Sequence, residues 1–213
     1  MSDSKIIGFL TTLWDIMYMG ILWMLFSLPI VTIGASTTAL YYVATKKVTD
    51  REGTYMIQDF WQSFKGNFVQ STITFWLLAV VGFAVWANFM LLDQMDLGSL
   101  AFIIRLALAF VAIQLLFIFT AIFAVIARFD LKLMPAFKAS FALTTKHLLS
   151  TIINVVFFLI MMMLGYLIPV MILFAMGIHA YFSSILLVRI FKQNNTEFEE
   201  HLDGSELEIN DEI

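Results

Sequence analysis

The chain contains no cysteine, only three prolines and few charges. Without cysteine it has no disulfide, no thiolate nucleophile and no Cys-ligated metal, although this absence does not decide the compartment. Charged residues make up 13% of the 213 residues, against about a quarter in soluble domains. The histidines at 147, 179 and 201 lie far apart, without the close spacing of metal motifs. The sequence therefore predicts no metal site, no cofactor and no separate soluble domain.

Apolar residues dominate what is present. They make up 61% of the chain, and the mean hydropathy is +0.91. A helical crossing of a bilayer needs about 20 apolar residues, and four runs are long enough: residues 6–28, 68–92, 100–127 and 148–176. Two shorter runs, 30–45 and 178–191, follow Pro29 and Gly177. Cleavage of the first run as a signal peptide is disfavoured, because the run is too long and its basic flank is weak.

The distribution of basic residues favours a crossing by both short runs. If residues 30–45 did not cross while the first run did, Lys46, Lys47 and Arg51 would lie opposite Lys5. With six crossings, every basic residue except Arg105 falls on one side, as the positive-inside rule requires of the cytoplasmic face. We therefore expect a multi-pass protein of the cell membrane with both termini in the cytoplasm.

The predicted fold is an all-α, polytopic transmembrane bundle over residues 1–192. Residues 193–213 hold eight of the sixteen acidic residues and no basic one. Such a composition predicts a disordered cytoplasmic tail.

One stretch resembles a known family. It reads Leu-Pro-Ile-Val-Thr-Ile-Gly-Ala-Ser-Thr-Thr-Ala-Leu-Tyr-Tyr over residues 28–42, and Phe60, Phe64 and Lys65 follow it. This pattern resembles the YesL family of bacterial membrane proteins, and the likeness in character extends to the turn at 128–130 and the apolar segment ending at Arg189. The resemblance implies association with carbohydrate uptake systems of the ATP-binding-cassette type. It implies no catalytic residue.

Polar residues within the apolar runs are candidates for a ligand site. Asp15 is about 14 Å from the inner end of its run by helical rise, near the midplane, where a carboxylate is costly and suggests function. Arg105 could pair with Asp15, reach the outer acidic loop, or extend to the interface. Asn154 and His179 are expected to join interhelical hydrogen bonds.

Small residues after Pro29 form a second candidate. Four-residue spacing of small side chains lets another helix approach closely. Alternatively, free N–H groups after Pro29 could bind an anionic or polar ligand. The candidate ligand-binding residues are Asp15, Thr32, Gly34, Ser36 and Arg105.

Two amphipathic segments are predicted on the cytoplasmic interface, one from residue 57 to 68 and one from 133 to 144. Their apolar and basic residues would rest on the lipid surface or dock on a partner. The residues concerned are Phe60, Trp61, Phe64 and Lys65 in the first segment, and Phe137, Lys138 and Phe141 in the second.

No phosphate-binding loop, dinucleotide motif or hydrolase motif is present in the sequence. We therefore expect a non-catalytic accessory component of carbohydrate uptake, with the lipid bilayer and permease subunits as partners and no role for nucleic acid. The alternatives are a small transporter or channel built around Asp15, and an intramembrane enzyme.

Overall fold

The computed structural model describes residues 2–49, 55–92, 94, 98–129, 131–171 and 174–190, and all regular elements within them are helical. The predicted acidic tail lies outside these residues. The elements are α1 Ser2–Ser27, η1 Ile30–Thr32, α2 Ile33–Thr49, α3 Met56–Gly66, α4 Phe68–Leu92, α5 Ser99–Arg128, α6 Leu133–Lys146, α7 Leu148–Leu167, η2 Pro169–Met171 and a last helix, Phe174–Ile190. The predicted all-α class is confirmed, as are the two amphipathic helices, α3 and α6.

Four helices are long and apolar enough to cross a membrane, one within each of the four predicted long runs, although the fourth ends at Leu167 and not at 176. They are Ile7–Ser27, Phe68–Leu92, Leu100–Arg128 and Leu148–Leu167. The chain is accordingly a helical membrane protein. The last helix and α2 are shorter, with α2 having 17 residues, or about 25 Å of helical rise. Their crossing of the bilayer stays a prediction.

The predicted break at Gly177 is wrong. Helix α7 ends at Leu167, and Ile168 has an extended conformation with φ −129° and ψ 93°. A residue before proline is driven out of the helical region by the proline ring, so Pro169 sets the break. Gly177 instead lies inside the last helix, where an added Cβ would overlap the carbonyl oxygen of Ile16 and lie 3.0 Å from the backbone nitrogen of Gly20.

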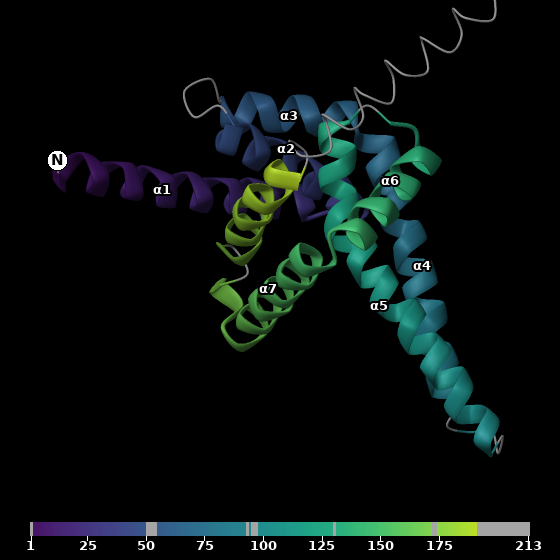
Figure 1. Ribbon diagram of the computed structural model, residues 1–213. Coiled ribbons are helices and arrows are strands. Elements are labelled where there is room, and N and C mark those ends of the chain that lie inside the picture. Colours follow the sequence, from purple (N-terminus) through teal and green to yellow (C-terminus); the bar gives the residue numbers. More distant parts are fainter. Residues whose placement is uncertain are drawn as a thin grey trace, which may run out of the picture.

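The core is built around α2. Eleven of its 17 residues are buried, and it contacts α1, α3, α4 and α5. In Figure 1, α1, α2 and α3 gather at one end of the molecule, while the α4–α5 hairpin and the hairpin of α7 with the last helix diverge from them. Small residues make the central position of α2 possible: a Cβ on Gly34 would lie 2.7 Å from the Cβ of Phe75 and overlap the carbonyl oxygen of Ser71.

The contacts of α1 and α2 with α3 were not expected. Phe26, near the end of α1, lies with its ring 5.2 Å from the ring of Phe60 in α3. At the other end of α2, Lys46 forms an ion pair with Asp59 of α3 at 2.8 Å. Six crossings would place the turn at Pro29 on the outer face, a bilayer away from α3. The prediction of an outer turn and the prediction of α3 on the inner interface therefore cannot both hold.

Burial along α4 and α5 is uneven. The buried residues of the first half of α4 are Ser71, Thr74 and Leu78, and those at the end of α5 run from 120 to 126. Toward the connection between the two helices, most residues from 79 to 91 and from 102 to 113 are exposed or only partly buried. The layer of α1, α2 and α3 thus covers only one end of the α4–α5 hairpin (Figure 1).

Candidate functional site

Two ion pairs join α2 to its neighbours. Lys47 lies 2.8 Å from the carboxylate of Asp15 in α1, and Lys46 lies 2.8 Å from that of Asp59 in α3. The second oxygen of Asp59 accepts a hydrogen bond from the backbone nitrogen of Tyr55 at 2.9 Å. Both aspartates are buried, with 6% of each residue exposed. Consecutive lysines at the end of α2 thereby hold helices on two sides.

The partner of Asp15 is Lys47, and not Arg105, which the sequence suggested. Lys47 is in the last turn of α2, which the distribution of charge predicts to lie at the inner face. Asp15 therefore lies level with that end of α2, because antiparallel neighbours meet in register. The equal separation of the two residues from the turn could have revealed this pair: Asp15 precedes Pro29 by about as many residues as Lys47 follows Thr32.

The candidate ligand-binding residues are not brought together. Thr32 precedes Lys47 by fifteen residues, or about 22 Å along α2, so Thr32 and Asp15 lie at opposite ends of that helix. Arg105 is exposed on the part of α5 that the α1–α2–α3 layer does not cover.

The hydroxyl groups after Pro29 bond to the chain itself. The Thr32 hydroxyl donates to the carbonyl of Phe26 at 2.6 Å and lies 2.7 Å from that of Pro29. The Ser36 hydroxyl donates to the Thr32 carbonyl at 3.0 Å. Together with the packing of Gly34 on α4, these bonds support the helix-packing interpretation of this segment over the ligand-binding one.

The predicted interface residues divide into two groups. Phe60 is fully buried and Phe64 is 9% exposed, so these two rings form part of the protein core and not of an external surface. Trp61 is 44% exposed, and the amine of Lys65 lies 4.6 Å from the centre of its indole ring. On α6, Lys138 and Phe141 are exposed, and Phe137 is partly buried.

Sequence reasoning missed a polar cluster where α2, α5 and the last helix meet. The Tyr41 hydroxyl lies 3.3 Å from the carbonyl oxygen of Thr120 and 3.4 Å from Nδ1 of His179. One turn along α2, the hydroxyl groups of Thr45 and Ser184 are 3.2 Å apart. His179 had been assigned an interhelical hydrogen bond, which these contacts confirm. Its partner on α2, Tyr41, could not be identified from hydropathy, because hydropathy does not distinguish a tyrosine within an apolar run from its apolar neighbours.

A cavity of about 220 Å³ adjoins this cluster. Its wall is formed by residues of α1, α2, α4, α5, α7 and the last helix, and most of these residues are apolar. The polar contributions come from Trp23, Thr37, Tyr41, Thr120 and His179. The indole nitrogen of Trp23 donates to the Thr37 hydroxyl at 3.0 Å, so part of this polarity is already satisfied within the wall.

A second hollow lies between α1 and the start of α3. Its volume is about 330 Å³, and it is lined by Asp15 together with Trp14, Tyr18, Tyr55 and Gln58. A carboxylate among aromatic rings is suited to a cation or a sugar, but Lys47 already neutralises this carboxylate.

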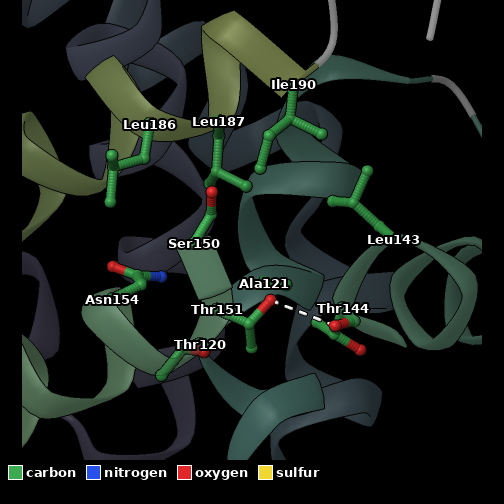
Figure 2. A pocket seen from close by; sticks show the side chains of 10 residues that line it. All are labelled: Thr120, Ala121, Leu143, Thr144, Ser150, Thr151, Asn154, Leu186, Leu187 and Ile190. Carbon is green, nitrogen blue, oxygen red and sulfur yellow. Dashed lines mark hydrogen bonds between the residues drawn. The ribbon is translucent and has the colours of Figure 1, made fainter. Parts of the chain in front are cut away.

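A third space, shown in Figure 2, lies where α5, α6, α7 and the last helix meet. Its volume of about 10 Å³ is no more than a single water requires. The Thr151 hydroxyl donates to the Thr144 carbonyl at 3.2 Å, and Oδ1 of Asn154 has no hydrogen-bond partner among the described residues. The side chains in Figure 2 therefore serve packing and not the binding of a solute. Among the residues that the structure describes, no three His, Asp or Glu side chains are close enough to share a metal.

With this geometry established, comparison with known proteins gives two matches. Residues 16–89 match the family described as "Protein of unknown function, DUF624". "Uncharacterized protein YteU" of Bacillus subtilis (strain 168) is 27% identical over 141 residues, covering 63% of this chain and 61% of that protein. No solved structure matches.

The family match coincides with a structural unit. Residues 16–89 comprise the second half of α1, the whole of α2 and α3, and most of α4. This part contains α2 and the Lys46–Asp59 pair, while Asp15, the partner of Lys47, directly precedes it. The cavity residues Thr120 and His179 lie outside it.

Proposed function

We propose that the chain is a non-catalytic accessory component of a carbohydrate uptake system of the ATP-binding-cassette type, and that it works by contact with the permease subunits. The residues after Pro29 resemble the YesL family, whose members accompany such systems, while the matched family and the matched protein are both described without an activity. The packing and the exposed surface of residues 16–89 are therefore the basis of the proposal.

The observation that carries the proposal is the character of residues 16–89. They form a packed layer in which Lys46 pairs with the buried Asp59, and Lys47 pairs with Asp15, the residue directly before this range. A charged group that is buried and paired supports structure more readily than chemistry on a solute. The layer presents outward the polar and aromatic side of α3, where Gln58, Trp61 and Lys65 are exposed.

That exposed side has the composition of a docking surface. Aromatic side chains are enriched in the centres of protein interfaces, and tryptophan is among their commonest anchors, while a lysine such as Lys65 is more typical of the polar rim. Trp61 is partly held by Phe26, whose ring lies 5.6 Å away, and by Lys65. A tryptophan held in place loses less conformational entropy when a partner covers it.

Affinity purification from the native host tests this proposal. The tagged chain, extracted in mild detergent, should carry the permease subunits of a carbohydrate uptake system. Replacing Trp61 and Lys65 by alanine should lower their recovery at least tenfold. Val80→Ala, at a site 62% exposed on α4, is the control and should recover them as the wild type does. Wild-type protein that purifies without any permease subunit would refute the proposal.

The competing proposal is a small transporter, and the cavity beside Tyr41 and His179 is the observation that favours it. A mostly apolar cavity with a few converging polar groups is the usual form of a small-molecule site. Purified protein in liposomes would then move a solute, and His179→Phe would abolish this flux without loss of the folded protein. The absence of flux for every sugar tried, together with recovered permease subunits, would leave the accessory role.

A further inference from the structure

The orientation of α3 relative to the membrane follows from its composition and length. It has eleven residues, about 16 Å of rise, and cannot cross a hydrocarbon core of about 30 Å. Gln58, Gln62 and Lys65 are exposed on one side, while Phe60 and Phe64 are buried on the other. A helix of this kind lies along an interface with its polar side toward water. It follows the lysines at the end of α2, which places it on the cytoplasmic side.

The second half of α1 and the whole of α2 run side by side in opposite directions. Near the turn between them, the indole nitrogen of Trp23 bonds to Thr37 at 3.0 Å. At the far end of α2, Asp15 meets Lys47 at 2.8 Å. Contacts at both ends of the pair require two nearly parallel axes.

The α1–α2 pair also runs alongside α3. Asp59, in the first turn of α3, meets Lys46 at the end of α2. Phe64, near the end of α3, lies 5.2 Å from Phe26 at the end of α1. Phe26 lies equally close to Phe60, the neighbour of Asp59, so α3 contacts both ends of the α1–α2 pair and runs along it. Figure 1 shows α1 and α3 extending across the same end of the molecule. Helices that share the direction of α3 share its orientation to the membrane plane.

We propose that α1 and α2 do not cross the bilayer but form a hairpin within its inner leaflet, and that the acyl chains of this leaflet bind the exposed side of α1. The crossings are then α4, α5, α7 and the last helix. Because neither α1 nor α2 crosses, Lys5 and Lys46 still fall on one side, and the positive-inside rule is satisfied as well as with six crossings.

The surface of α1 is suited to lipid and not to water. Its exposed large side chains are apolar, namely Ile7, Phe9, Leu10, Leu13, Trp14, Ile21, Met24 and Leu25. Its exposed hydroxyl group is already satisfied, since Thr11 donates to the carbonyl of Ile7 at 2.8 Å. The Thr12 hydroxyl likewise donates to the carbonyl of Gly8 at 2.9 Å, so both threonine hydroxyl groups have partners within the helix, as a hydrocarbon environment requires.

Labelling of single cysteines distinguishes the two topologies, and the absence of native cysteine removes any background. An impermeant maleimide applied to intact cells should label a cysteine replacing the exposed Gln94, between α4 and α5, and should not label one replacing Val31, which is 51% exposed. Labelling of Val31→Cys in intact cells to the extent seen for Gln94→Cys would overturn the proposal.

A depth measurement gives an independent test. Spin labels on Phe9→Cys, Trp14→Cys and Leu25→Cys are compared in proteoliposomes of phosphatidylethanolamine and phosphatidylglycerol, using oxygen and a water-soluble nickel chelate as relaxants. The proposal predicts high oxygen exposure at all three sites, with no return to the aqueous phase at Leu25. In a crossing α1, Leu25 would lie about 24 Å beyond Phe9, and its label would become exposed to the chelate.

The α4 helix supplies the matched control. Labels replacing Val69, Val80 and Met90, all exposed, should show greatest depth at Val80 and chelate exposure at both ends. An α1 profile of the same shape overturns the proposal. So does low oxygen exposure along α1, because it would show that protein, such as a second copy of this chain, covers that surface in place of lipid.

Discussion

The contact between α2 and α4 gives the sharpest quantitative prediction. Replacing Gly34 by alanine adds a Cβ that lies 2.7 Å from the Cβ of Phe75 and overlaps the backbone oxygen of Ser71. A backbone atom cannot move aside as a flexible side chain can, so the two helices must separate. One turn further along α2, the hydroxyl groups of Thr38 and Ser71 are 2.7 Å apart, and separation would lengthen that hydrogen bond.

The expected loss can be built from these two effects. Overpacking of this kind costs about 1 to 3 kcal/mol, and a weakened interhelical hydrogen bond costs about 1 kcal/mol. Alanine recovers about 1 kcal/mol through its higher helix propensity. The net loss for Gly34→Ala is therefore about 1 to 3 kcal/mol, and at about 2 to 4 °C per kcal/mol the melting temperature should fall by roughly 2 to 12 °C.

Thermal unfolding in mild detergent, followed by size-exclusion fluorescence, measures this difference. Gly82→Ala is the matched control, because a Cβ at Gly82, within α4, meets nothing within 4 Å. This control should melt at the wild-type temperature or slightly above it. If Gly34→Ala and Gly82→Ala change the melting temperature equally, α2 and α4 do not pack at Gly34 and the reasoning fails.

Three further substitutions test other contacts. Gly177→Ala should destabilise the protein by a similar amount, because its Cβ would overlap the backbone of α1. Gly8→Ala is the control and should not destabilise it, because the space around Gly8 is open. Equal melting temperatures for the two variants would contradict the packing of the last helix on α1. Asp15→Asn should lose about 2 to 4 kcal/mol because it leaves the charge of Lys47 uncompensated in a mostly buried place, and adding Lys47→Gln should recover part of that loss. If the double variant melts no higher than the single one, the two groups are not paired. Tyr41→Phe should cost less than about 1 kcal/mol, since both of its hydrogen bonds are long; a larger loss in the same melting assay would indicate a stronger polar contact.

Hydropathy predicted the helices well because apolar length is a local property. The runs at 68–92 and 100–127 became α4 and α5, and the periodicity around Phe60 predicted α3. The break before the last helix was misplaced, because the glycine at 177 was read as a helix end. Its role is close packing against α1, which depends on a neighbour distant in the sequence.

The candidate site was harder to predict. Asp15 was singled out as a costly group, but Arg105 was suggested as its partner, and Lys47 was placed on the cytoplasmic side without one. The small residues around Gly34 were correctly interpreted as a packing surface. Phe60 and Phe64 were assigned to the membrane surface and are instead buried, because amphipathic periodicity shows that one side of a helix is covered without showing what covers it.

The sequence by itself determined that this is an all-α membrane protein, because the cost of exposing a polar group to lipid depends on each residue and can be judged from composition. Only the tertiary structure decided how those helices lie against one another. An apolar helix is compatible with a path across the bilayer and also with a position inside one leaflet. Contacts between distant residues, such as Phe26 with Phe60 and Asp15 with Lys47, select between these arrangements.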